Sequence, residues 1–84
     1  MTMYEFTVVL RDVPEMTFEL SDALYEAGCD DCTPGSSGGV SKVDFHREAE
    51  SFEAAVRSAI ANVQAAGCVV ERVEIEADAA MLKA

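Results

Sequence analysis

The regular alternation of polar and apolar residues over 3–11 limits the fold more than any other feature of the sequence. Tyr4, Phe6, Val8 and Leu10 fall on one face of an extended segment, which predicts a strand with one buried face. Such a face has to be covered by a second layer of structure. Because 84 residues fit a single domain, we expect the covering layer to come from the same short chain.

Two segments have the apolar spacing of amphipathic helices. The first spans residues 17–27, with Thr17 as its N-cap and Gly28 as the left-handed residue that ends it. The second runs from an N-cap at Ser51 to a stop at Gly67. Each carries one apolar stripe that predicts packing onto the sheet. The stripes are Met16, Leu20, Ala23, Leu24 and Ala27 in the first helix and Phe52, Val56, Ala59, Ile60 and Val63 in the second.

The middle of the chain contains a glycine-rich turn region followed by a strand. Residues 28–39 predict a loop, or a loop with a very short strand near 31–34. Residues 40–46 predict a strand with Val43 and Phe45 facing inward.

The last strand is predicted over residues 68–76. Glu71 interrupts its alternation, so we expect a bulge or a late strand start there. We take residues 1–76 as one domain and residues 77–84 as a C-terminal tail. The side chains expected to face the core are Val69, Val73 and Ile75.

The resulting order is β-α-β-β-α-β. It predicts an α+β fold of the ferredoxin-like, ACT-like type, in which two helices cover one face of an antiparallel sheet and a very short second strand lies at the edge. On the uncovered face we expect Val9 and Val70 among polar residues, where they would form the contact of a dimer. We expect the chain to be a monomer or a weak homodimer.

Sixteen acidic residues against six basic residues give the chain a formal net charge of −10. This balance argues against direct binding to nucleic acid and to anionic membranes, since both depend on Lys and Arg. It favours a basic protein surface or a cation as the partner. No apolar run reaches the length of a membrane span, and the N-terminal residues do not resemble a signal peptide. Together with three cysteines, which suit reduced thiols, this predicts a cytoplasmic protein.

Acidic residues follow the predicted first helix on the side opposite its apolar stripe. Their spacing of 4, 3 and 4 places them within an arc of about 60° on a helix, and no Lys or Arg occurs between Arg11 and Lys42. The pattern is that of a solvated acidic face or of a surface that mimics nucleic-acid phosphates. The candidate partner-binding residues are Glu15, Glu19, Asp22 and Glu26, extended by Asp30 and Asp31 and flanked by Phe18 and Tyr25.

The cysteines allow a metal site by spacing alone. Cys29 and Cys32 form a CxxC that could join Cys68 and His46 in a Cys3His zinc set. The CxxC follows a helix C-terminus and adjoins two aspartates, an environment that disfavours the thiolate. We therefore expect structural or incidental thiols and no metal, cofactor or catalytic residue.

Three motifs, Glu26–Asp31, Val43–Arg47 and Ala59–Ile60, resemble the N-terminal domain of short, poorly characterised bacterial helix-turn-helix proteins, and the similarity covers about residues 3–76. In that family a DNA-binding helix-turn-helix follows the last strand, whereas this sequence ends at Ala84. The resemblance implies a sensor-like domain that acts through protein contacts or a small ligand.

Two functional hypotheses follow. The first is a small acidic inhibitor that occupies the basic nucleic-acid-binding surface of another protein by DNA mimicry, as an anti-CRISPR protein of a phage does to a CRISPR effector complex. The second is a non-catalytic regulatory or dimerisation module related to the N-terminal domain of helix-turn-helix regulators or to antitoxins.

Overall fold

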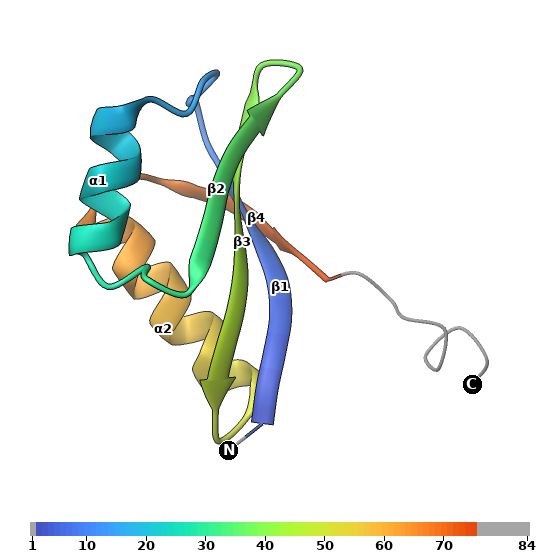
Figure 1. The fold of residues 1–84 in the computed structure, drawn as a ribbon. Helices are drawn as coiled ribbons and strands as arrows, with labels where there is room; N and C mark the ends of the chain where they lie inside the picture. Colours follow the sequence, from blue (N-terminus) through green and yellow to red (C-terminus); the bar gives the residue numbers. More distant parts are fainter. Residues whose placement is uncertain (1, 76–84) are drawn as a thin grey trace.

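A computed structural model describes residues 2–75 of the chain, and it shows an α+β domain built from four strands and two helices. The strands form one antiparallel sheet in the order β2-β3-β1-β4, and both helices lie on the same side of it (Figure 1). The predicted order of elements is confirmed. The elements are β1 (Thr2–Leu10), α1 (Phe18–Glu26), β2 (Cys32–Ser37), β3 (Val40–Ala49), α2 (Phe52–Ala65) and β4 (Val70–Glu74).

The core lies between the helices and the inner face of β1 and β3. Phe6 pairs with Phe45 and Val8 with Val43 across these strands, and all four side chains are buried. The Phe6 and Phe45 rings stack with centroids 5.4 Å apart, and Phe52 of α2 meets Phe6 edge-on at 5.9 Å. The predicted alternation of β1 is therefore confirmed, and its apolar face supplies the centre of the core.

Both helices begin and end where the sequence predicts. The hydroxyl of Thr17 accepts a hydrogen bond from Leu20 N at 3.2 Å, which makes Thr17 the N-cap of α1. Ser51 caps α2 in the same way. Gly28 and Gly67 follow the helices with φ of +112° and +91°, a conformation that glycine adopts without steric cost.

The second strand is longer than predicted. Instead of a very short segment near residues 31–34, β2 has six residues. Gly38 and Gly39 form a two-residue turn with φ of 59° and 80°, and Ser37 pairs with Val40 beside it. Such a turn matches the twist of a hairpin, so backbone pairing extends β2 even though its sequence lacks an apolar alternation.

The bulge predicted at Glu71 is confirmed, and β4 begins at Val70, two residues later than the predicted start of the strand. Val9 pairs with Arg72 and Leu10 with Val70, which leaves Glu71 as the extra residue. The bulge turns Val70 toward the core instead of the uncovered face. Val73 packs against the core as predicted. The prediction that Val69 and Ile75 face the core is wrong, since their exposed fractions are 53% and 54%.

Val9 does not form the exposed apolar contact expected on the uncovered face. Its side chain is only 1% exposed, and its cross-strand neighbours are Lys42 and Arg72. Both of these side chains bond the Glu74 carboxylate, at 3.3 and 3.1 Å. Charged groups and their aliphatic stems therefore occupy this part of the uncovered face.

Candidate partner-binding surface

The outer side of α1 combines acidic residues with two exposed aromatic rings. Phe18 is 89% exposed and Tyr25 is 66% exposed. One helical turn separates each of them from Asp22, which lies between them on the same side. Exposed aromatic rings on one side of a helix are typical of contact surfaces. We call the α1 face the exposed residues Phe18, Glu19, Asp22, Tyr25 and Glu26.

The remaining predicted residues lie outside the helix. Glu15 is exposed but precedes the N-cap, so the helical spacing argument does not extend to it. Asp30 is exposed in the loop that follows α1 and continues the acidic surface past the helix end. Asp31 differs from the others because it is partly buried and its carboxylate is paired with Arg47.

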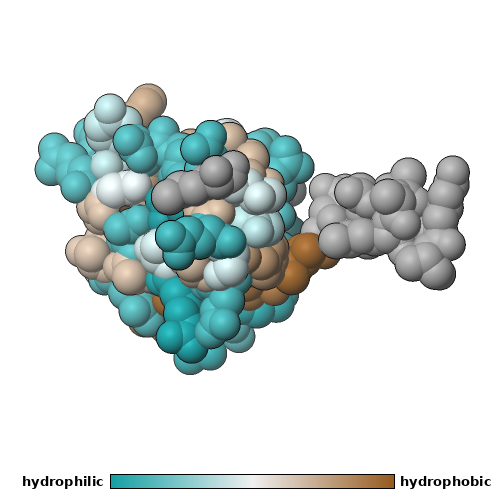
Figure 2. All heavy atoms as spheres, turned by 90° about the horizontal axis from the view of Figure 1, so that it is seen from below, coloured by the Kyte–Doolittle hydropathy of each residue, from teal (hydrophilic) through white to brown (hydrophobic). Residues whose placement is uncertain are grey.

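The acids of the α1 face form no ion pair within residues 2–75. Among residues 2–75, every Lys and Arg side chain lies within 4.0 Å of a carboxylate, and none of these carboxylates belongs to α1. Figure 2 shows that hydrophilic atoms cover most of the lower end of the molecule, so polarity alone does not distinguish α1. The pairs are Arg11–Glu71, Lys42–Glu74, Arg47–Asp31, Arg57–Glu53 and Arg72–Glu74.

The mostly buried Arg47 of β3 forms a hydrogen-bond cluster with partly exposed residues behind the end of α1. Arg47 is 9% exposed, and its guanidinium lies over the Phe45 ring, 4.9 Å from the ring centroid. Nε and Nη2 donate to the two carboxylate oxygens of Asp31 at 2.8 and 2.9 Å. Nη1 donates to Ser58 Oγ and Asn62 Oδ1 of α2, and Nη2 also donates to Gly28 O. All five N–H groups of Arg47 are thus used inside the domain.

This cluster anchors the C-terminal end of α1 to α2. The last turn of α1 carries no basic residue, yet Arg47 bonds the carbonyl of Gly28 and Asn62 Nδ2 donates to the carbonyl of Ala27 at 2.9 Å. The positive charge of Arg47 at this position also interacts favourably with the negative end of the α1 helix dipole. The same guanidinium lowers the pKa of Asp31 below its ordinary value, chiefly through the hydrogen bonds. We call Arg47, Asp31, Ser58 and Asn62 the Arg47 cluster.

Sequence reasoning did not identify this cluster. The predicted strand ended at His46, one residue short of Arg47. A usable signal was present, because Arg47 shares the parity of Val43 and Phe45 and so faces inward once the strand is extended.

The thiols are placed for packing. Cys29 and Cys68 are buried, and Cys32 Sγ donates to Cys29 O at 2.8 Å. Burial raises the pKa of all three thiols, that of Cys32 to about 12, so the protonated form dominates at neutral pH. His46 faces the opposite side of the sheet, with Nδ1 3.1 Å from a Glu5 carboxylate oxygen. Within residues 2–75 no group of three His, Cys, Asp or Glu side chains is arranged to hold a metal ion.

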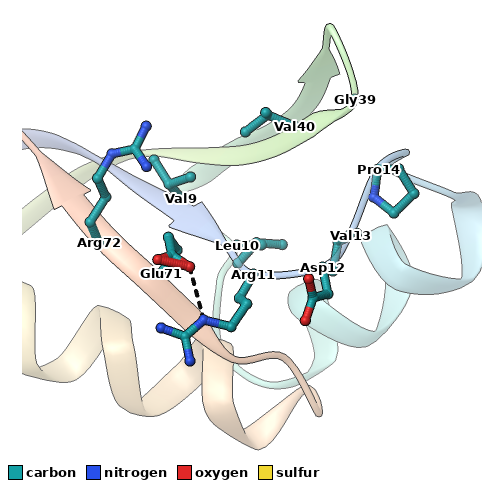
Figure 3. A pocket seen from close by; sticks show the side chains of 10 residues that line it. All are labelled: Val9, Leu10, Arg11, Asp12, Val13, Pro14, Gly39, Val40, Glu71 and Arg72. Atoms are coloured by element: carbon teal, nitrogen blue, oxygen red, sulfur yellow. Dashed lines mark hydrogen bonds and ion pairs between the residues drawn. The ribbon is translucent and has the colours of Figure 1, made fainter.

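A shallow hollow of about 490 Å³ lies at the end of the sheet beside the β2–β3 turn (Figure 3). Arg11 and Glu71 point toward each other at one side of it, and Arg72 lies near Val9 at the other. Both guanidinium groups are paired with carboxylates. None of the candidate partner-binding residues lines this hollow.

A scan against protein-family models, a search of curated proteins and a search of solved structures found no match to this chain. In the part of the chain that the structure describes, no helix has the length and apolar character to cross a membrane. Function is therefore inferred from the surface itself.

Proposed function

We propose that this chain is a non-catalytic protein-binding module whose α1 face docks on a basic surface of another protein. The observation that carries the proposal is that one short helix combines acids without an ion-pair partner with the exposed rings of Phe18 and Tyr25. Every basic side chain of residues 2–75 neutralises an acid elsewhere, whereas Glu19, Asp22 and Glu26 have no cation within 4.0 Å among those residues. Like charges three and four residues apart destabilise an isolated helix slightly, and a basic partner would relieve that repulsion.

The spacing of the acids supports a nucleic-acid-binding protein as the partner. Along the helix axis the three carboxylates lie about 5 Å apart, comparable to but coarser than one phosphate per ~3.4 Å of a DNA strand. A groove lined with Lys and Arg for phosphates would meet carboxylates on α1 and, beside them, the rings of Phe18 and Tyr25. We infer inhibition by DNA mimicry, with a CRISPR effector complex as one target class.

The scaffold supports such a role through rigidity. We infer that the order β2-β3-β1-β4, with both helices on one side, is a ferredoxin-like, ACT-like arrangement. The Arg47 cluster fixes the end of α1 to α2. A face presented on a fixed helix loses less conformational entropy on binding than a loop does. Asp31 contributes to this anchoring. Because its carboxylate is already paired with Arg47, we expect it to add less to the partner contact than the acids of α1 do.

A capture experiment tests the proposal. Tagged chain is incubated with purified CRISPR effector complexes of different types, at low and high salt and with duplex DNA as competitor. We expect capture that DNA and salt both displace, because phosphate-like carboxylates compete for the same cations. The variant Glu19→Lys/Asp22→Lys should lose capture, whereas Glu48→Lys/Glu50→Lys, with the same change in net charge on exposed residues outside α1, should retain it.

Two results would contradict the mimicry proposal. One is capture that is equal for both double variants, which would make general acidity sufficient. The other is no capture of any complex, which would shift weight to the regulatory or dimerisation module as the function.

A further inference from the structure

The β4 edge of the sheet is open to a further strand. In the order β2-β3-β1-β4, β4 has a neighbour on one side only among residues 2–75. An edge strand presents backbone N–H and C=O groups that can pair with another strand.

The two edges of the sheet differ in their capacity for such pairing. Within β2, Pro34 has no backbone N–H and Gly35 adds no side chain to pack. β4 has the sequence VERVE without Pro or Gly, and the exposed Val69 and Ile75 flank it. Of the two edges, β4 is the one suited to extend the sheet.

We propose that two copies of this chain pair through their β4 edges, antiparallel and two-fold symmetric, with Val73 opposite the same residue of the second copy. In this register Arg72 of each copy lies opposite Glu74 of the other, on the uncovered face of a continuous sheet. Both side chains are partly exposed, at 56% and 41%, and so can reach across the edge.

Charge selects this register over its neighbours. A two-fold axis at Glu71, Arg72 or Glu74 would place two identical charges directly opposite each other, which destabilises strand pairing. An axis at Val70 would bring no opposite charges together. The axis at Val73 alone, among the β4 residues, places opposite charges face to face without opposing like charges.

The ion pairs specify the register more than they add affinity. Arg72 and Glu74 already bond within one chain at 3.1 Å, so dimerisation exchanges an intrachain contact for an interchain one. The net charge of −10 on each copy opposes association, and added salt screens that repulsion. Self-association should therefore strengthen with salt, whereas docking of the α1 face on a basic partner should weaken.

Sedimentation equilibrium of the full 84-residue chain, over a concentration series at low and high salt, tests the proposal. We expect a reversible monomer–dimer equilibrium whose dissociation constant falls as salt is added. Arg72→Glu and Glu74→Arg should each raise the dissociation constant by about tenfold, because each places like charges opposite twice per dimer. The double variant Arg72→Glu/Glu74→Arg exchanges the charges and should return the constant to within about threefold of the starting value.

Matched controls separate register from net charge. Arg57→Glu and Glu53→Arg change the total charge by the same amounts on the outer side of α2, where the two residues form an i,i+4 pair. These two variants should have a dissociation constant close to that of the starting chain. Circular dichroism checks that each variant folds. A monomer at every concentration would overturn the proposal. So would single reversals at Arg72 and Glu74 that act no more strongly than these controls, or a double variant that fails to recover.

Discussion

The two helices begin with the same kind of N-cap and are similarly amphipathic, yet the structure uses them differently. α2 has 14 residues, contacts β1, β3 and β4, and buries Ala55, Ala59 and Val63. α1 has nine residues, contacts mainly α2 and fully buries only Leu24. The outer side of α2 carries the Arg57–Glu53 pair at 2.7 Å, whereas the outer side of α1 carries acids and exposed rings.

This difference shows how a short helix can remain attached to the domain while much of its surface stays exposed. Local signals do not distinguish α1 from α2, because both have good caps and one apolar stripe. What compensates for the small buried surface of α1 is the Arg47 cluster, which ties its C-terminal end to α2 through polar contacts. The following predictions test that dependence, from the largest expected effect to the smallest.

Arg47→Met should cause the largest loss of stability. It leaves the Asp31 carboxylate, the Gly28 carbonyl and the α2 polar groups without their donor, which costs about 3 kcal/mol for a mostly buried charge. Urea unfolding followed by circular dichroism gives the free energy of unfolding. Arg57→Met, which removes an exposed ion pair of α2, should cost only about 0.5 kcal/mol. Equal losses for the two variants would show that the anchoring role of Arg47 is wrong.

Gly28→Ala should lower the free energy of unfolding by about 2 kcal/mol, and Gly67→Ala by about 1 kcal/mol. Both glycines have positive φ at a helix end. A Cβ at Gly28 would also lie 2.9 Å from Asn62 Nδ2, whereas a Cβ at Gly67 would meet nothing within 4 Å. The difference between the variants measures the close approach of α1 to α2. No difference in urea unfolding would mean that Asn62 moves aside freely.

The Arg47–Asp31 pair should make the free energy of unfolding depend on pH in the acidic range. Arg47 lowers the pKa of Asp31 in the folded chain, so the unfolded chain binds this proton more readily. The stabilisation is present above the ordinary Asp pKa of about 4 and is lost as the pH falls through the lower folded value.

Asp31→Asn should remove this part of the pH dependence. The variant should be less stable than the starting chain at neutral pH, with the gap closing as the pH falls below about 4. Other paired carboxylates, such as Glu71 and Glu74, titrate in both proteins and cancel in the difference. Urea unfolding at a series of pH values checks the trend, and a gap that stays constant with pH would contradict it.

The sequence was most informative where structure depends on neighbouring residues. Thr17, Ser51 and Gly67 mark helix ends through contacts and dihedral angles within one turn, so they could be predicted. The interruption of β4 at Glu71 could be predicted as well, but the orientation of Val69 and Val70 before it could not, because it depends on how β4 pairs with β1 around the bulge. The Arg47 cluster depends on contacts between residues 11 to 19 positions apart, and Asn62 meets Ala27 across 35 positions. Exposure of Phe18 depends on how little of α1 meets the core.

The double variant Glu19→Lys/Asp22→Lys should have the smallest effect on stability, within about 0.5 kcal/mol. Two changes oppose each other. Removing like charges from the outer side of α1 relieves repulsion, whereas losing Glu19 from the first turn removes a favourable interaction with the helix dipole. Neither side chain is hydrogen-bonded to Arg47. Urea unfolding should therefore give nearly the same free energy as for the starting chain, even though the proposed partner surface has changed by four charge units. A loss approaching that of Arg47→Met would mean that the acids of α1 support the fold, and the reason to assign them to a partner would disappear.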